Sequence, residues 1–337
     1  MKGFLEDKTI LITGGTGYLG RALTNEILKY NPKSVRLFSR DEVKHHNMRE
    51  IFNHDSRLRN FIGDVRDYQR LLKATRQADI VIHAAALKRL DVLEYNVEES
   101  IKTNVDGTLN VVWACLENNV EKAVMVSTDK ACAPVNTYGA CKFVSERIFS
   151  ESNYNKGDLK TVFTTVRYGN VLESTGSVIP FFTTKINNGE PIPLTDERMT
   201  RFIISHEEAS ELIFDAIRYG EGGEVFVPKL PSFKITDLIE ILQEKFNKKN
   251  GVEVIGLRPG EKIHEQMINF SEIPRTYKFK NLYVIRSCIE NFKKRKKPYY
   301  VEQGERVNEE EMAEYSSKDE VISKEEVVKI FKNLGLL

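Results

Sequence analysis

The sequence predicts an α/β fold with a doubly wound parallel sheet, because short apolar, β-branched runs alternate with longer amphipathic stretches through its first half. Residues 9–13 form the first run and lead into a glycine-rich turn, which is typical of the first strand and helix of this fold. Four more strands are predicted at 34–38, 60–62, 79–83 and 122–127. Another is expected at 161–167, and a run at 224–227 is expected to return to the sheet.

The chain has 337 residues, 41% of them hydrophobic, which is enough for a large core and an additional lobe. Beyond residue 168 the alternating pattern gives way to glycine and proline, as at Gly169, Gly189 and Pro191. We therefore expect a Rossmann domain over 1–168. A smaller substrate lobe is expected mainly over 169–337, interrupted where strand 224–227 rejoins the sheet.

The balance of charge argues against a nucleic-acid or membrane partner. Lys and Arg total 50 against 49 Asp and Glu, so no overall field attracts a polyanion. The basic run at 293–297 is followed directly by acidic residues, which favours a solvated loop over a nucleic-acid site. No apolar stretch has membrane-spanning length, and the four cysteines show no CxxC spacing, so we expect a cytoplasmic protein without a metal site.

The first run ends in Gly14-Gly15-Thr16-Gly17-Tyr18-Leu19-Gly20, a GxxGxxG pattern that opens a helix. Glycines let the backbone turn tightly and approach a pyrophosphate, and the helix N-terminus offers unpaired N–H groups to it. An ordinary strand-to-helix turn could use the same residues, but the flanking strand and helix favour a dinucleotide site. The candidate contacts are Gly14, Thr16, Gly17, Tyr18, Leu19 and Gly20.

Arg40 follows the second predicted strand, where an NAD-specific protein usually carries a carboxylate for the ribose hydroxyls. A guanidinium at this place suits the 2′-phosphate of NADP, so NADP is the predicted cofactor. Lys44 could add a second charge or be an ordinary surface lysine, and Asp41 has the alternative role of a helix N-cap.

Residues that follow the third and fourth strands are expected to face the same cofactor. Asp64 and Val65 follow the third, where the carboxylate can accept a hydrogen bond from the adenine amino group. Ala84 follows the fourth, where small side chains leave room for the ribose or pack a helix. Lys88 and Asn104 are further candidates, for which a structural role is equally open.

A catalytic group is predicted after the fifth strand, where Thr128-Asp129-Lys130 precedes a YxxxK pattern formed by Tyr138 and Lys142. A tyrosine and a lysine four residues apart share one face of a helix. Lys142 is expected to lower the pKa of the Tyr138 phenol and to hold the nicotinamide ribose, which makes Tyr138 a base toward a sugar hydroxyl. In the alternative reading, Asp129 caps a turn and Lys130 makes a surface ion pair.

The sequence resembles the extended short-chain dehydrogenase/reductases, and among them the inverting UDP-N-acetylglucosamine 4,6-dehydratases. The resemblance runs nearly end to end and is carried by the segments TGGTGYLG, FSRDE, GDVRD, HAAALK, STDKA, YGACK, RYGNV, RMTRF and RPGEKIHE. It implies that Tyr138 takes the proton of the sugar 4-hydroxyl while NADP accepts a hydride from carbon 4. Lys130 would then remove the carbon 5 proton, and Asp129 would protonate the departing 6-hydroxyl before the hydride returns to carbon 6.

The resemblance also implies a UDP-sugar substrate. The segments 198–201 and 258–262 each supply a guanidinium that can bind a diphosphate, although these arginines could instead tie the lobe to the sheet. The candidate substrate contacts are Lys88, Asn170, Val178, Thr195, Arg201, Arg258 and Glu261.

Other functions compatible with the sequence are a retaining 4,6-dehydratase, a UDP-sugar 4-epimerase and a regulatory Rossmann protein. An epimerase needs no acid–base pair beyond the redox tyrosine, and a regulatory protein would be expected to lack Tyr138 or Lys142. Relatives form symmetric assemblies, so we expect a homo-oligomer in which helices at 100–118 and 135–152 pair.

Overall fold

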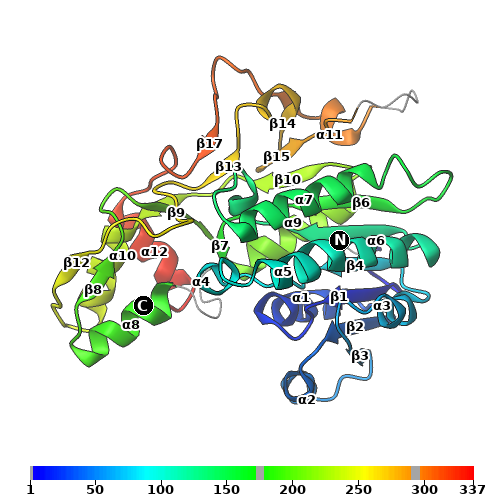
Figure 1. The fold of residues 1–337 in the computed structure, drawn as a ribbon, viewed down its shortest axis with the longest axis horizontal. Coiled ribbons are helices and arrows are strands. Elements are labelled where there is room, and N and C mark those ends of the chain that lie inside the picture. The colour runs from blue at the N-terminus through cyan, green and yellow to red at the C-terminus, as the bar shows by residue number, and fades with distance from the viewer. Residues whose placement is uncertain (1–2, 172–177, 290–296) are drawn as a thin grey trace.

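The computed structural model describes residues 3–171, 178–289 and 297–337, so nearly all of the basic run at 293–297 lies outside the described residues. A ten-stranded sheet runs through the centre of the molecule (Figure 1), in the order β16-β14-β15-β10-β6-β5-β4-β1-β2-β3. Its first six strands along the chain are β1 (Thr9–Thr13), β2 (Ser34–Ser39), β3 (Leu58–Ile62), β4 (Ile80–His83), β5 (Lys122–Val126) and β6 (Val162–Val166). All six were predicted within about two residues of their ends.

These six strands pair in parallel, and β1 lies between β2 and β4. Every residue of β1 is buried, which explains its continuous apolar and β-branched sequence. The order of the strands reverses between β1 and β4, and ligands of such sheets bind in the crevice at that point. The predicted doubly wound parallel sheet is thereby confirmed.

The sheet continues beyond β6 with strands from much later in the chain. β10 (Val225–Pro228) pairs with β6 in parallel, as expected for the run at 224–227. Three antiparallel strands that the sequence did not predict follow it, namely β15 (Leu282–Ile285), β14 (Thr276–Phe279) and β16 (Glu305–Arg306). Residues far beyond 169 therefore complete the central sheet.

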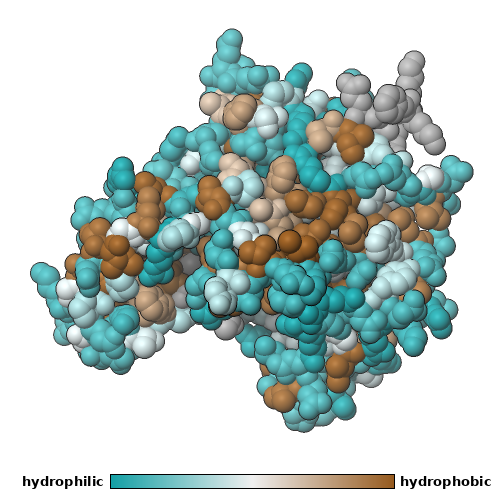
Figure 2. Space-filling model, in the orientation of Figure 1, coloured by the Kyte–Doolittle hydropathy of each residue, from teal (hydrophilic) through white to brown (hydrophobic). Residues whose placement is uncertain are grey.

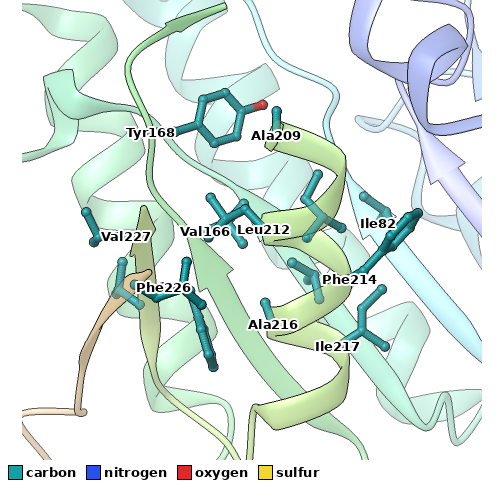
Figure 3. Close-up of a cluster of buried hydrophobic side chains, with 14 of the residues drawn as sticks. Ile82, Val166, Tyr168, Ala209, Leu212, Phe214, Ala216, Ile217, Phe226 and Val227 are labelled. Carbon is teal, nitrogen blue, oxygen red and sulfur yellow. The ribbon is translucent and has the colours of Figure 1, made fainter. Parts of the chain in front are cut away.

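Helices cover both faces of the sheet (Figure 1). One face carries α1 (Tyr18–Leu28) and α9 (His206–Tyr219), which pack against each other. Figure 3 shows the apolar side of α9, including Leu212 and Ile217, lying over Val166 of β6 and Phe226 of β10. The other face carries α3 (Tyr68–Thr75), α6 (Gly107–Glu117) and α7 (Thr137–Glu151), and α2 (Glu42–Ile51) lies beside β3.

α6 is the last part of a longer helical segment. It is preceded by α4 (Leu90–Leu93), by α5 (Val97–Ser100) and by a π-helical turn over Ile101–Asp106 that joins α5 to α6. Such turns are often found at functional sites, and this one changes which side chains face the sheet.

A smaller lobe lies at one end of the sheet (Figure 1). Its apolar core is formed mainly by the helices α8 (Val178–Asn188), α10 (Ile235–Lys245) and α12 (Lys324–Asn333). Within the part of the chain that the structure describes, its strands form three small sheets. One contains β7 (Asn170–Val171), β9 (Thr200–Ile204) and β11 (Ser232–Lys234). The second pairs β8 (Ile192–Leu194) with β12 (Val252–Val254), and the third pairs β13 (Gln266–Ile268) with β17 (Tyr315–Ser316). The short α11 (Tyr299–Glu302) packs on β14 instead. Among the described residues, no helix combines the length and apolar character needed to cross a membrane.

A buried ion-pair network joins the lobe to the main sheet. Arg167, directly after β6, is 1% exposed, and its guanidinium binds the carboxylates of Glu146 on α7 and Glu272 in the lobe. It also donates to the Met267 carbonyl oxygen at 2.7 Å, while Ser127 donates to Glu146 at 2.6 Å. One cation thus fixes the end of β5, helix α7 and the lobe relative to each other.

We expect Arg167→Ala to lower the free energy of unfolding by about 3–5 kcal/mol, because two buried carboxylates would lose their counterion. Urea unfolding followed by circular dichroism measures the change. Arg198→Ala is the matched control, since Arg198 pairs with Asp196 on an exposed segment and its loss should leave the midpoint unchanged. A loss below about 1 kcal/mol for Arg167→Ala would mean that the network contributes no more than a surface ion pair.

Candidate active site

The glycine-rich turn forms a cradle at the end of β1. Gly14 has a φ of +68°, and a Cβ atom there would lie 3.0 Å from the Cα of Ala85, so only glycine fits without strain. Helix α1 starts at Tyr18, and its N-cap residue is Gly17, which has no side chain to bind the N–H groups of the first turn. No N-cap side chain occupies this helix N-terminus, which is a common position for a bound phosphate.

A cleft of about 450 Å³ extends from this cradle along the carboxyl ends of the strands. It contains nearly all the predicted cofactor contacts. Those that line it are Gly14, Thr16, Gly17, Tyr18, Leu19, Gly20, Arg40, Lys44, Asp64, Val65, Ala84, Lys88, Tyr138 and Lys142. The glycine cradle at one end and the YxxxK pair further along fit a nicotinamide dinucleotide.

Two cations line the cleft after β2. Arg40 is more than half exposed, with Nη1 at 3.8 Å from Asp64 Oδ2, and Lys44 Nζ lies 3.6 Å from Asp41 Oδ2. The Asp41 carboxylate accepts a hydrogen bond from the backbone N–H of Lys44 and so caps α2, which is the alternative role predicted for it. Both basic groups therefore remain accessible to an anion in the cleft.

Asn104 supports the wall of the cleft without lining it. Its side-chain amide binds both the N–H and the carbonyl oxygen of Leu87, at 2.8 and 2.9 Å, and so fixes the loop after β4. The neighbouring Thr103 lines the cleft instead, and its buried hydroxyl has no partner among the described residues. Sequence reasoning missed Thr103, because the π-helical turn that carries it departs from the period of 3.6 residues.

The catalytic candidates meet between β5 and α7. Thr128 donates to Asp129 Oδ1 at 2.9 Å and is hydrogen-bonded to Tyr138, while Lys130 Nζ lies 3.0 Å from Asp129 Oδ1. Helix α7 packs so closely on this turn at Gly139 that a side chain there would collide with the carbonyl oxygen of Lys130. The missing side chain therefore allows Tyr138 to approach Lys130 and Asp129.

Burial dominates the electrostatics of the YxxxK pair. Burial raises the pKa of Tyr138 to about 12, although the charge of Lys130 and the neighbouring Thr128 hydroxyl act against the rise. Burial lowers the pKa of Lys142 to about 8, and its Nζ donates to the carbonyl oxygen of Val126 at 2.8 Å. The pKa of Tyr138 is therefore raised overall, and the charge that acts against the rise is that of Lys130.

Glu265 is a further residue of the site that sequence reasoning missed. Its Oε1 lies 3.1 Å from Lys130 Nζ, opposite the contact with Asp129, although it comes from a segment far along the chain. Glu265 ends the segment RPGEKIHE that carries the resemblance, but only Arg258 and Glu261 of that segment were predicted to contact the substrate.

The structure places the predicted substrate contacts in three groups. Lys88 and Asn170 line the cleft itself. Thr195, Arg258 and Glu261 meet in the lobe, where Glu261 accepts from Thr195 at 3.1 Å and lies 3.9 Å from Arg258.

The remaining two candidates do not line the cleft. The guanidinium of Arg201 is bound to the carbonyl oxygens of Thr200, Lys262 and Ile263. Val178 begins α8 and packs on the core of the lobe.

Residues 10–287 match the family model described as polysaccharide biosynthesis protein. The chain belongs to this family. Its Rossmann fold agrees with the resemblance to the extended short-chain dehydrogenase/reductases.

Relatives in this family carry two different enzyme names. The chain is 48% identical over 284 residues to the inverting UDP-N-acetylglucosamine 4,6-dehydratase of Campylobacter jejuni, covering 84% of each protein. It is 41% identical over 273 residues to a protein of Rickettsia typhi named UDP-glucose 4-epimerase, covering 80% of each. Among solved structures, Pen from Bacillus thuringiensis superposes with a TM-score of 0.90 at 37% identity, covering 99% of this chain and all of that one.

Proposed function

We propose that this protein is a UDP-N-acetylglucosamine 4,6-dehydratase that inverts carbon 5. The observation that carries the proposal is the turn Asp129-Lys130, which holds an amine beside Tyr138 at the cleft and a buried carboxyl in contact with that amine. Removal of water from a sugar needs an acid and a base in addition to the group that oxidises carbon 4. The identity to the Campylobacter jejuni enzyme supports the same reaction and the UDP-sugar substrate.

Each residue has a defined task in this reaction. A dinucleotide held by the glycine-rich turn and by Lys142 would supply the redox chemistry, namely acceptance of a hydride from carbon 4 and its return at carbon 6. Tyr138 receives the proton of the 4-hydroxyl as the phenolate, a form that the charge of Lys130 favours against the effect of burial, and Thr128 lies beside its oxygen. Lys130 removes the carbon 5 proton, which the neighbouring ketone has made acidic. Asp129 gives its proton to the departing 6-hydroxyl, so that the net reaction is loss of water.

A UDP-sugar 4-epimerase is the alternative that the relatives raise, since Rickettsia proteins of similar identity carry that name. Epimerisation needs only oxidation and reduction at carbon 4, and it leaves the proton of carbon 5 in place. The acid–base pair at Asp129 and Lys130 would then have no task. A retaining dehydratase differs only in the face from which carbon 5 is reprotonated.

One assay distinguishes these three activities. The protein with NADP+ is incubated with UDP-N-acetylglucosamine in deuterated water, and the products are followed by proton NMR. We expect a 4-keto-6-deoxy sugar that carries deuterium at carbon 5 and has the L-arabino configuration. A 4-epimer without label at carbon 5 would establish the epimerase, and retention at carbon 5 would establish the retaining enzyme.

Lys130→Ala is expected to separate the two halves of the reaction. The variant should still reduce NADP+ when substrate is added, because Tyr138 and Lys142 are intact. Water should not be lost, and recovered substrate should carry little deuterium at carbon 5, because no base removes that proton. Absorbance at 340 nm and NMR follow the two steps. Exchange at the wild-type rate would show that another group is the base.

We also propose that the dinucleotide is NADP. Arg40 and Lys44 line the cleft after β2, where a 2′-phosphate would be placed, and Asp41 is occupied as the cap of α2. A guanidinium binds phosphate through charge-assisted hydrogen bonds that the ribose hydroxyls of NAD cannot match.

Arg40→Ala should therefore weaken NADP+ binding about 10- to 100-fold, the loss of one charged hydrogen bond, and should change NAD+ binding far less. Isothermal titration with both cofactors measures the ratio. Arg218→Ala, on the exposed side of α9, is the control and should leave both affinities unchanged. Equal losses for the two cofactors in Arg40→Ala would contradict the NADP assignment.

We further propose a homo-oligomer that associates through α6 and α7. Figure 2 shows apolar side chains over these helices, and Trp113 and Val144 are exposed on them.

We also propose a division into a cofactor domain over 1–168 and a mainly substrate-binding lobe over 169–337, with β10, β14 and β15 returning to the sheet.

A further inference from the structure

The Lys130 ammonium is held between two buried carboxylates. Its Nζ lies 3.0 Å from Asp129 Oδ1 and 3.1 Å from Glu265 Oε1, and the side chains of Asp129 and Glu265 are 1% and 3% exposed. Only Lys130 of the three lines the cleft. Glu265 therefore acts on any reaction in the cleft through Lys130.

The lobe fixes Glu265 firmly in this position. Its N–H donates to Ser317 Oγ at 2.9 Å, and its carbonyl oxygen accepts from the N–H of Ser317 at 2.8 Å. The Ser317 hydroxyl is in turn hydrogen-bonded to Thr200 at 2.7 Å. Two segments distant in sequence, around 200 and around 317, thus hold the backbone that carries Glu265 against the catalytic turn.

The two carboxylates differ because their surroundings differ. Burial raises the pKa of Asp129, and the charge of Glu265 adds to the rise while Lys130 opposes it. The pKa of Glu265 is lowered, although burial acts against this, because Lys130 and Arg201 lie close to it, with Arg201 Nε at 3.7 Å. The other charged or titratable groups that face this cluster are Lys262 and Tyr138. Asp129 is thus the carboxyl suited to hold a proton, and Glu265 the one that stays ionised.

Each carboxylate also keeps one unused oxygen. Asp129 Oδ2 and Glu265 Oε2 are buried without a hydrogen-bond partner among the described residues. Buried acceptors in this state are uncommon and call for a reason. For Asp129, an oxygen without a donor stabilises the carboxylate poorly, which agrees with this group taking up a proton during the reaction.

We propose that Glu265 is a positioning residue for the elimination step, holding the Lys130 amine between itself and Asp129 while protons move. This role rests on the proposed dehydratase function, because it concerns the base and acid of that reaction. Glu265 does not line the cleft.

The protons balance in this arrangement. Both carboxylates raise the pKa of Lys130 even though burial alone would lower it, so the free protein holds an ammonium. The ammonium passes one proton to Asp129, which leaves an amine and a carboxylic acid. The amine takes the proton of carbon 5, and the acid gives its proton to the hydroxyl of carbon 6 as that C–O bond breaks. Lys130 is then again an ammonium and Asp129 a carboxylate, while Glu265 stays ionised throughout.

Glu265→Gln tests the proposal in the full-length protein with NADP+ and UDP-N-acetylglucosamine. We expect reduction of NADP+ in a single turnover to stay within about twofold of wild type, since no group of the first step is changed. Exchange at carbon 5 and loss of water should fall about 100-fold, as for a catalytic group misplaced by about 1 Å. Equal loss in both steps, or exchange at the wild-type rate, would overturn the proposal.

The pH dependence of elimination separates a positioning role from a merely structural one. Glu265 raises the pKa of both Asp129 and Lys130, so its neutralisation should move the acid and the alkaline limb of the rate profile to lower pH. The shift should be about one unit, as for a charge lost within a few ångströms. Glu265→Asp keeps the charge with a shorter side chain, so its limbs should stay at the wild-type pH while its rate is partly restored. Limbs that do not move in Glu265→Gln would count against the proposal.

A control variant guards against general damage to the fold. Glu224→Gln neutralises another buried carboxylate, one that binds Tyr300 and the N–H groups of Glu221 and Gly222 and does not contact Lys130. Its ratio of elimination to NADP+ reduction should equal that of wild type. If wild type itself neither labels carbon 5 nor loses water, the proposed function fails, and this outcome is distinct from a defect confined to Glu265→Gln.

Discussion

The pairing of Arg167 with two buried carboxylates is the constraint on which the site depends. A charge this deeply buried is tolerated only when it is paired and hydrogen-bonded, so the guanidinium imposes one relative position on its partners. Those partners lie on α7, which carries Tyr138, and in the segment 267–272, which leads from β13 to β14 and lies close to Glu265 in the chain. The redox residues and the elimination residues are thereby held in one frame.

Within that frame, environment assigns different tasks to groups of the same chemical type. Asp129 and Glu265 are both buried carboxylates that contact one lysine, yet Arg201 lies close only to Glu265. The same principle holds for the two lysines. Lys142 meets a backbone carbonyl oxygen and has a lowered pKa, whereas Lys130 meets two anions and has a raised one. The local partner distinguishes the two lysines because solvent screens buried charges only weakly.

The sequence was sufficient for the features that depend on local pattern. The six parallel strands and the glycine turn follow from apolar runs and spacing, and Thr128, Tyr138 and Lys142 follow from their place after a strand. It was insufficient where distant segments meet. Strand β15 joins the sheet beside β10, which lies well before it in the chain, and Glu265 meets Lys130 across more than 100 residues. Thr103 depends on a π-helical turn. The raised pKa of Tyr138 likewise reflects burial, which spacing does not report.

The chain passes between the sheet and the lobe several times. It leaves the sheet after β6, returns at β10, leaves again, returns at β14 and β15, and finally ends in the lobe with α12. A lobe attached by a single linker can swing as a rigid body, but one attached by several crossings would have to deform each of them at once. Substrate entry therefore has to rely on local movements of loops at the mouth of the cleft, and the two parts should melt in a single cooperative transition.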